Sequence, residues 1–552
     1  MTIIDRIKVP FFLIIVALAS VIGINQYHFG MWNQFISLPW LYELIDPANY
    51  PHDLLVEQYS NSPTFFLFLL KWALPFFGEN VPLLFFSFYL ICLALTIYSF
   101  YRLGQEIFKS KEAGVLAVVL LSFAFPVIGD VSIWDTLLME RTITYPILLL
   151  SILHLYKGRL WYAILLLGLA FNIHPLSAIY VIAASALAVL LTEGFKKEYI
   201  WQGFFLLLMV SPVLLLKFSN TAPGESSLSF SETWMEVMRL RNGHHTFPSE
   251  FPPSIFLKTA LIILSYYVIL AKGNFAPKAK VFLHAFGGSI LFMMLLGTVF
   301  TEFFPVKLII QFQFYRAFLF MGTLSLILWA GMLVKNPKPV FYLLAIPFLA
   351  QYAYGEWAKT ISALSLIGLA WFVIRYFGFK RKASLGLSFA YLSLGLIAML
   401  MRGGLEIHQG NQENDWYEVQ DWFRENTAQD ALAIVPPAEL GFRVRSLRTS
   451  YGDWFDGTKA FFSEQYAEYW YDHMSRLKCT DPDHLKEDYS TLQSQDFLNI
   501  WDRESDKHSE AYVVHYADRS VDKLPVAYLN EHYVVYQLPT KETPVFLASV
   551  GN

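Results

Sequence analysis

Long apolar runs separated by short polar segments dominate the first three quarters of the chain. About 13 of these runs approach the roughly 15 to 20 residues that an α-helix needs to cross a hydrocarbon layer about 30 Å thick. They lie at residues 10–24, 81–101, 113–128, 142–156, 160–173, 175–192, 200–216, 253–271, 281–300, 306–334, 340–354, 357–376 and 384–401. The pattern predicts a polytopic α-helical membrane bundle of about 13 transmembrane helices over residues 1–401.

Two apolar segments near the N-terminus need a separate interpretation. The run at 62–78 is short, contains Lys71 and has a proline near each end, which suits a re-entrant or interfacial helix better than a full crossing. The N-terminus begins like a signal peptide, but no small-residue cleavage site follows before NQYHFG, so we predict a retained first helix.

The basic residues fall on one side of the membrane when the predicted spans alternate. By the positive-inside rule, this places the N-terminus in the cytoplasm and the C-terminal part outside, in a protein of the plasma (inner) membrane. The residues on the predicted cytoplasmic side are Arg6, Lys8, Arg102, Lys109, Lys111, Lys157, Arg159, Lys196, Lys197, Lys272, Lys278, Lys280, Lys335, Lys338, Arg375, Lys380, Arg381 and Lys382.

A second domain is predicted over residues 402–552, where charged residues become frequent and the long apolar runs stop. It opens with a helical pattern, DWYEVQDWFRENTAQD, followed by the short β-like run ALAIVPP, and it closes with AYVVHY and HYVVYQL. β-Branched and aromatic residues in such runs are typical of strands. We therefore expect a small extracytoplasmic α/β domain.

Composition supports a membrane protein and excludes several function classes. The chain is 55% hydrophobic and only 16% charged, against roughly 25% charged residues in soluble domains. A net charge of −4 without a basic stripe excludes nucleic acid as a partner. The two cysteines imply no disulfide framework. The sequence contains no Walker, G-x-G-x-x-G, G-x-S-x-G or H-E-x-x-H motif.

Candidate chemistry lies in three long polar loops on the predicted outer side, at 25–61, 129–141 and 217–252. The first contains no Lys or Arg, and its Asp46 and Asp53 can serve as a general base or hold a divalent cation. The alternative is structural: Asp46 begins a turn with Pro47, and Asp53 caps the helix that starts in DLLVEQY. Spacing alone does not decide between them.

Four further candidate residues lie at or inside predicted spans. Glu140 and Arg141 open a span, where charge is costly unless it pairs internally or faces a polar cavity. His174 lies in the tight FNIHP connection between two spans, as a structural residue or as part of a polar site. Arg316 lies inside an apolar span, and with Arg141 it can hold a lipid phosphate.

The third loop contains MRLRNGHHTFP, with Arg241, His244 and His245. Two adjacent histidines are a weak metal signal, because consecutive side chains rarely converge on one ion. We predict that Arg241 and His244 contact a polar substrate from a flexible loop, and we assign no metal ligands.

The acidic first loop, the interfacial run that ends in FFGEN and the span closing on YRLGQEIFKSKEAGVLAVVLLSFAFP together resemble the C-type (GT-C) superfamily of polytopic membrane glycosyltransferases. Oligosaccharyltransferase catalytic subunits, protein mannosyltransferases and aminoarabinose transferases belong to this superfamily. The resemblance covers roughly residues 1–200 in pattern and the C-terminal domain in position.

The resemblance implies transfer of a hexose or pentose from a polyprenyl-phosphate carrier to a glycan, lipid or protein acceptor on the outer face. It also implies that an acidic residue of the first loop, Asp46 or Asp53, is the catalytic base or a ligand of a divalent cation such as Mg²⁺ or Mn²⁺. The D-D or D-E dipeptide and the W-W-D-Y-G signature are absent, and the nearest string is SYGDWFDG at 450–457. Oligosaccharyltransferase activity is therefore not expected.

The sequence thus favours a membrane glycosyltransferase. In this hypothesis Asp53 or Asp46 is the catalytic acid/base, Arg141 and Arg316 hold the carrier phosphate, and Glu140 and His174 shape the acceptor side. A transporter or flippase of a lipid-linked or polar solute is the main alternative, with Glu140, Arg141 and Arg316 lining its pathway. A non-catalytic membrane scaffold is the third, and it predicts that the outer-loop carboxylates are dispensable.

Overall fold

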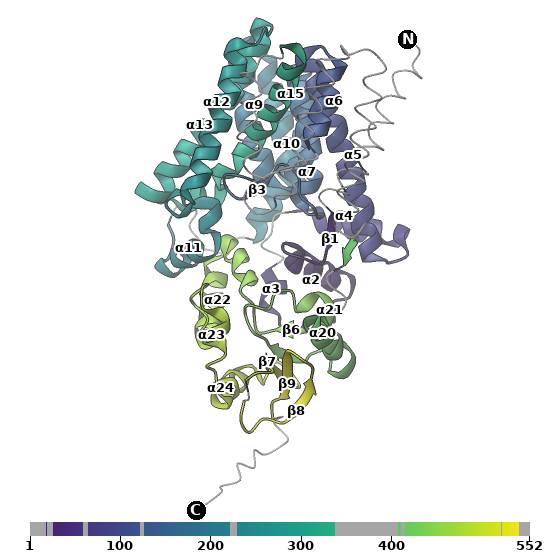
Figure 1. Cartoon of the computed structure of the whole chain (residues 1–552), viewed down its shortest axis with the longest axis vertical. Coiled ribbons are helices and arrows are strands. Elements are labelled where there is room, and N and C mark those ends of the chain that lie inside the picture. Colours follow the sequence, from purple (N-terminus) through teal and green to yellow (C-terminus); the bar gives the residue numbers. More distant parts are fainter. Residues whose placement is uncertain are drawn as a thin grey trace, which may run out of the picture.

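A computed structural model describes most of the helical region and most of the C-terminal domain (Figure 1). The described residues are 18, 22, 26–58, 64–121, 126–220, 229–336, 407–409, 414–519 and 521–539. The spans predicted at 340–354, 357–376 and 384–401, and nearly all of the span at 10–24, lie outside these residues.

A bundle of long apolar helices forms the upper body of the molecule in Figure 1. Its main helices are α5 (Val81–Phe108), α6 (Lys111–Leu121), α7 (Glu140–Tyr156), α8 (Leu160–Ile173), α9 (Pro175–Glu193), α10 (Glu198–Asn220), α12 (Pro253–Lys272), α13 (Pro277–Thr298) and α15 (Phe318–Lys335). Six described segments are long and apolar enough to cross a membrane: Val81–Phe108, Pro175–Glu193, Glu198–Lys217, Pro253–Lys272, Pro277–Phe303 and Lys307–Lys335. The predicted polytopic helical bundle is confirmed at this level.

The helices differ in how much of their surface the protein covers. The most apolar window of the segment Lys307–Lys335 is 94% buried, whereas that of α10 is only 17% buried. Phe204, Leu207 and Leu215 on α10 are more than 60% exposed. Apolar side chains left uncovered over a whole helix suit contact with lipid, so α15 forms the centre of the bundle and α10 its perimeter.

Glycines permit a close backbone contact between α5 and α6. A Cβ atom on Gly114 would lie 2.5 Å from the carbonyl oxygen of Tyr101, and one on Gly104 would lie 2.9 Å from the Cα of Gly114. Two backbones can approach this closely only where side chains are missing.

Short elements cover the end of the bundle that faces the C-terminal domain. They are β1 (Tyr27–Phe29), α2 (Gln34–Ile45), α3 (Leu54–Glu57), α4 (Phe66–Ala73), η2 (Leu74–Phe77), β2 (Pro126–Val127), β3 (Val131–Ser132), α11 (Glu232–Thr246), η3 (Pro248–Glu250), the π-helical turn η4 (Val299–Phe303), α14 (Lys307–Phe312) and η5 (Phe314–Ala317). Helix α4 and η2 together extend about 18 Å, and their Trp72 and Phe76 are 71% and 76% exposed. This short helix with bare aromatic side chains fits the predicted interfacial segment at 62–78.

The C-terminal region is an α/β domain, as the sequence predicts. Its five-stranded sheet has the order β6 (Thr449–Ser450), β5 (Leu432–Ile434), β7 (Ala511–Tyr516), β9 (Tyr533–Gln537) and β8 (Val526–Leu529). The first three strands are parallel, and β9 and β8 are antiparallel to their neighbours. Around the sheet lie α20 (Asp415–Asn426), α21 (Arg443–Ser446), η6 (Phe455–Phe462), α22 (Glu464–Arg476), α23 (Leu485–Tyr489) and α24 (Ser494–Glu504).

A two-stranded sheet joins the helical bundle to the start of the C-terminal domain. Strand β4 (Ile407–Gln409) pairs in parallel with β1, so the beginning of the first outer loop and the beginning of the α/β domain lie side by side. The first loop is therefore built into the junction rather than standing free of it.

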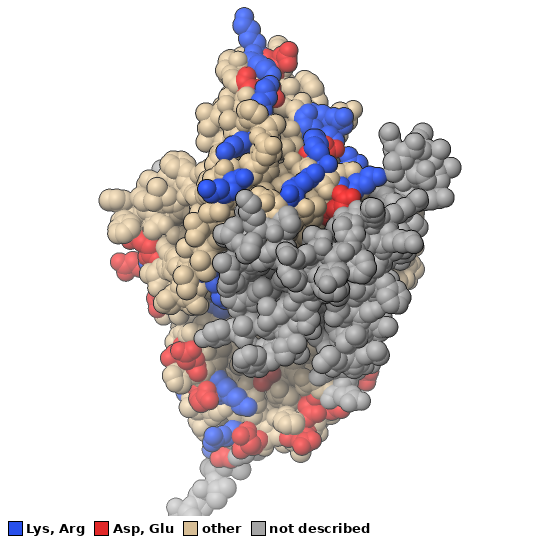
Figure 2. Space-filling view, turned by 45° about the horizontal axis from the view of Figure 1, so that its top comes forward, with Lys and Arg blue, Asp and Glu red and all other residues tan. Residues whose placement is uncertain are grey.

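Basic side chains gather at the end of the bundle opposite to the α/β domain (Figure 2). Lys109 and Lys157 both pair with Glu106, and Lys196 pairs with Glu193. These residues come from loops far apart in the sequence, and their common position agrees with the alternation of the predicted spans.

Candidate functional site at the junction

Asp53, the first predicted catalytic residue, lies fully buried where the first outer loop meets the α/β domain. Its Oδ1 accepts hydrogen bonds from the backbone N–H groups of Leu55 (3.0 Å) and Val56 (3.2 Å), and thus caps α3. Its Oδ2 accepts from Arg443 Nε (2.6 Å) and from the backbone N–H of Ser450 (3.1 Å). The predicted capping role is confirmed, and the ion pair fastens the loop to the α/β domain.

The catalytic role predicted for Asp53 finds no support in this arrangement. Arg443 is itself buried and also forms two 3.0 Å bonds to Asp456, so the carboxylate of Asp53 belongs to a closed ionic network. A base must reach the proton of an acceptor hydroxyl, and Asp53 would have to break this network to do so.

Asp46 is exposed in the turn that ends α2. Its Oδ1 accepts from the backbone N–H of Ala48 at 3.1 Å, which confirms the predicted turn. Its catalytic role stays a prediction.

Glu140 and Arg141 are the first two residues of α7, and their environments differ. Arg141 forms two bonds to Asp135, from Nε at 2.9 Å and from Nη2 at 2.7 Å, and both side chains are nearly buried. The costly charge of Arg141 is thus neutralised by internal pairing. The Glu140 carboxylate is half-buried and forms no hydrogen bond or ion pair within the part of the chain that the structure describes.

Arg316 lies where the long segment Lys307–Lys335 is broken between α14 and α15. The break is at Gln313, whose φ of 43° is left-handed, and Gln313 Oε1 accepts from Arg316 Nη1 at 2.7 Å. Nη2 lies 3.5 Å from His245 Nε2, and the buried Nε has no partner among the described residues. Within the described part of the chain, Arg316 therefore has unused N–H donors and no hydrogen bond to a carboxylate.

His174 caps α9, because its Nδ1 accepts from the backbone N–H of Ser177 at 3.2 Å. Burial, together with the positive charges of Arg141, Arg316 and Lys459, lowers the pKa of His174 to about 3. The ring is neutral at pH 7, as its role as an acceptor requires. The predicted structural role is confirmed, and the charges of three cations act on the His174 ring.

Lys459, which the sequence did not single out, lies in η6 of the α/β domain, and its charge acts on His174. Its Nζ lies 4.6 Å from the ring centre of Trp40 on α2 and 5.5 Å from that of Phe462. Burial lowers the pKa of Lys459, and the negative charge of Glu140 opposes this shift. No local pattern distinguishes this lysine, because only the docking of the two parts brings it to the bundle.

Arg241 contacts the same segment of the α/β domain from α11. Its guanidinium lies 4.9 Å from the ring centre of Trp454, and Nη2 is 3.4 Å from Thr458 Oγ1. Burial lowers the pKa of Arg241 to about 10, against the opposing charges of Asp453 and Asp456. Arg241 thus packs at the domain contact, and its predicted contact with substrate stays a prediction.

His244 and His245 lie in the last turn of α11, so this part of the third loop is helical. His244 Nε2 is 3.8 Å from Asp130 Oδ2, and His245 Nδ1 is 3.0 Å from the carbonyl oxygen of Gly129. Burial lowers the pKa of both histidines. Two described groups bring three possible metal-ligand atoms within 4.8 Å of one another: Asp130, His244 and His245 here, and Asp415, Glu531 and His532 on the α/β domain.

We refer to Arg141, Arg316 and Lys459, whose charges all act on the neutral ring of His174, as the cationic cluster. Asp135 neutralises Arg141, and the charge of Glu140 acts on Lys459 without a hydrogen bond between them. Among the described residues Arg316 has no ion-pair partner, so its positive charge is left in excess. Guanidinium and ammonium groups with spare donors are suited to phosphate oxygens. The cluster can therefore bind an anion beside one free carboxylate.

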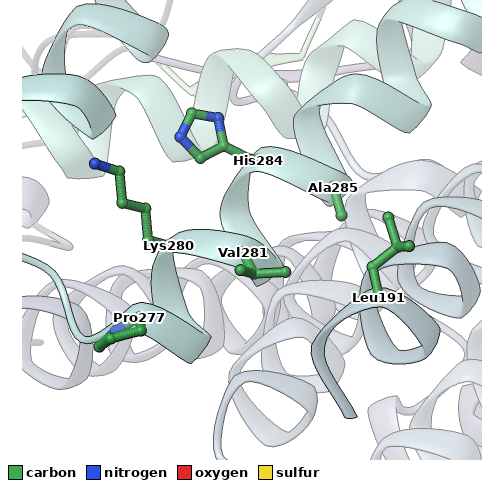
Figure 3. Close-up of a pocket in the computed structure, with 6 residues that line it drawn as sticks. All are labelled: Leu191, Pro277, Lys280, Val281, His284 and Ala285. Atoms are coloured by element: carbon green, nitrogen blue, oxygen red, sulfur yellow. The ribbon is translucent and has the colours of Figure 1, made fainter. Parts of the chain in front are cut away.

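The structure also contains a cavity of about 570 Å³ remote from this cluster. It lies between the end of α9 and the start of α13 and is lined by Leu191, Pro277, Lys280, Val281, His284 and Ala285 (Figure 3). It is mostly apolar, lies toward the basic end of the bundle and contains none of the predicted site residues.

Fold and site together define a class: a helical protein with several helices long and apolar enough to cross a membrane, and an α/β domain that contributes to a cationic cluster at its junction with the helices. Residues 414–477 match a protein family described as Domain of unknown function (DUF6798). This stretch contains Arg443, which pairs with Asp53, and Lys459 of the cationic cluster. A comparison with the curated proteins finds no match.

Proposed function

We propose that this protein is an integral membrane glycosyltransferase that moves a sugar from a polyprenyl-phosphate-linked donor to an acceptor on the outer face. The observation that carries the proposal is the spare positive charge of Arg316 at the junction, where the charges of Arg141 and Lys459 act together with it on His174. A carrier lipid lies in the membrane with its phosphate at the surface, and the junction is the level at which such a phosphate would be met.

The residues divide the chemistry between them. Arg316 and Lys459 bind the carrier phosphate, and Asp135 holds Arg141 in position next to them. Glu140, rather than the buried Asp53, is the general base: it accepts the proton of the acceptor hydroxyl as that oxygen attacks the anomeric carbon. The bond between the sugar and the phosphate breaks, and the two cations stabilise the charge that develops on the leaving phosphate.

The orientation of the protein follows from the same proposal. In this proposal the basic end of the bundle faces the cytoplasm, the α/β domain lies outside, and the chain has about 13 spans in the inner membrane. The acceptor then reaches Glu140 from the outer side.

The proposal is tested by transfer of radiolabelled sugar from a panel of polyprenyl-phosphate donors in membranes that contain the protein. We expect Glu140→Gln to lower transfer by about 10²-fold or more, as is typical when a general base is lost, and Arg316→Gln to weaken use of the donor. Glu198→Gln is the matched control, because Glu198 also opens a membrane helix but lies at the basic end, and it should leave transfer unchanged.

Two results would contradict the proposal. Transfer that survives both Glu140→Gln and Arg316→Gln would remove the assigned mechanism. A wild-type protein that uses none of the donors would favour the transport alternative instead.

A further inference from the structure

Asp130, His244 and His245 form a group that the proposed reaction does not use. Asp130 stands in the turn between β2 and β3, and the two histidines end α11. The ring centres of His244 and His245 are 3.9 Å apart, and His244 Nε2 is 3.8 Å from Asp130 Oδ2. The adjacent histidines thus converge here, which their spacing in the sequence did not predict.

The hydrogen bond from His245 to the Gly129 carbonyl leaves the other ring nitrogen of His245 available for a metal ion. A carbonyl oxygen can only accept, so Nδ1 must carry the proton that bonds to Gly129, and Nε2 keeps its lone pair. A histidine that donates its other N–H to a backbone carbonyl is the usual arrangement behind a metal ligand. The 3.5 Å separation of Nε2 from Arg316 is long for a hydrogen bond, so an ion can replace that contact.

The backbone around Gly129 fixes the turn that carries Asp130. Gly129 has a φ of 82° and Asp130 a φ of 49°. A Cβ at Gly129 would lie only 2.9 Å from the backbone nitrogen of Arg316, so the turn is pressed against η5. The turn that carries Asp130 is therefore held against η5 without an ion.

We propose that Asp130, His244 and His245 bind one divalent transition-metal ion, with Zn²⁺ as the best fit. Two imidazoles and one carboxylate are ligands that Zn²⁺ prefers, whereas Mg²⁺ prefers oxygen alone. The residues differ from Asp46 and Asp53, the positions to which the superfamily resemblance assigns a cation. Three protein ligands leave a coordination position open for a further group.

The metal site also bears on the proposed function, and its role in binding the carrier phosphate rests on that proposal. Arg316 borders the metal group, and two neighbouring cations repel each other unless an anion lies between them. A phosphate can satisfy both by placing one oxygen on the ion and another on Arg316. The metal then contributes to binding the carrier phosphate.

The test is a titration of the full-length, chelator-treated protein in detergent with Zn²⁺ alone, followed by metal analysis after gel filtration. Co²⁺ serves as a second probe, because its visible absorption reports imidazole coordination. We expect one ion per chain, and at least about a tenfold weaker affinity in His244→Ala and in Asp130→Asn. Both side chains are more than half exposed, at 54% and 64%, so these variants should fold, and equal melting temperatures without metal verify this.

His532→Ala is the matched control, because it disrupts the other possible group, Asp415, Glu531 and His532, on the α/β domain. It should leave the single ion in place. Unchanged binding in His244→Ala and Asp130→Asn, or loss of the ion in His532→Ala, would overturn the proposal.

Metal binding is measured without sugar transfer, so the two proposals can fail separately. A protein that binds the ion through these residues but transfers no sugar would refute only the proposed function. A protein that transfers sugar but binds no ion here would refute only the metal site.

Discussion

At the scale of single residues, the carboxylates of the first outer loop show how much depends on burial. Asp46 and Asp53 are both acidic residues of one polar loop, and the sequence offers each a catalytic and a structural role. In the structure Asp53 is completely buried between α3 and Arg443, whereas Asp46 stays in an exposed turn. A carboxylate should therefore contribute much more to the free energy of unfolding at position 53 than at position 46.

Replacing Asp53 by Asn should strongly destabilise the protein, although Asn can still cap α3. Removing one partner of a buried ion pair typically costs about 3 to 5 kcal/mol, and among the described residues Arg443 keeps only Asp456 as an ion-pair partner. Asp46→Asn should change the free energy of unfolding by less than about 0.5 kcal/mol. Denaturant unfolding followed by tryptophan fluorescence compares the two, and similar midpoints would refute the structural role of Asp53.

His174 should make the stability of the protein depend on pH. Burial, together with the charges of Arg141, Arg316 and Lys459, lowers the pKa of His174 to about 3 in the folded chain, whereas it is about 6.5 when unfolded. The unfolded state therefore takes up a proton first as the pH falls below about 6.5, and stability is lost, by up to about 2 kcal/mol at pH 5.

His174→Asn provides the comparison, because Asn offers an acceptor to Ser177 and does not titrate. Melting temperatures at pH 7.5 and pH 5 should fall less in this variant than in the wild type. An identical fall in both would show that His174 does not contribute to the pH dependence.

At the scale of elements, local interruptions position the site. The segment Lys307–Lys335 reads as one long apolar run, but Gln313 breaks it into α14, η5 and α15. The break presents Arg316 at the junction instead of inside the bundle. Close helix packing elsewhere holds this framework, and the contact of α5 with α6 depends on two glycines.

Gly114→Ala should destabilise the bundle, since the new methyl group would meet the Tyr101 carbonyl at 2.5 Å. Overpacking of this kind typically costs about 1 to 3 kcal/mol. Gly203→Ala in α10 is the matched control, because nothing lies within 4 Å of its added Cβ, and alanine favours a helix by up to about 1 kcal/mol. Thermal unfolding in detergent should separate the two variants in opposite directions.

At the scale of the whole molecule, the α/β domain is fastened to the bundle through η6 and the start of α22. Lys307 Nζ pairs with Glu464 at 2.6 Å, Trp234 donates to the carbonyl of Ala460, and Gln311 donates to that of Phe461. These contacts bring Lys459 to the cationic cluster. A site shared in this way requires both parts of the chain to be docked.

The proposed orientation predicts opposite accessibility of the two ends. Both native cysteines, Cys92 and Cys479, are buried, so they should give little background with a membrane-impermeant maleimide. In intact cells we expect the reagent to reach Asp483→Cys in the α/β domain once any outer barrier is opened. Lys197→Cys, at the basic end, should react only after the inner membrane is permeabilised. Reaction of both, or the reverse order, would refute the orientation.

The sequence by itself determined the helical membrane bundle, the α/β domain and the basic end, because hydrophobic periodicity and charge alternation are local properties of the chain. It also offered the correct structural roles for Asp46, Asp53 and His174, since turns and caps depend on a few neighbouring residues. Only the tertiary structure decided that Asp53 pairs with Arg443, that the charges of Lys459 and Arg316 both act on His174, and that Asp130 meets His244. Asp53 and Arg443 are 390 positions apart and belong to different domains. Contacts across such distances arise from packing, which no local pattern encodes.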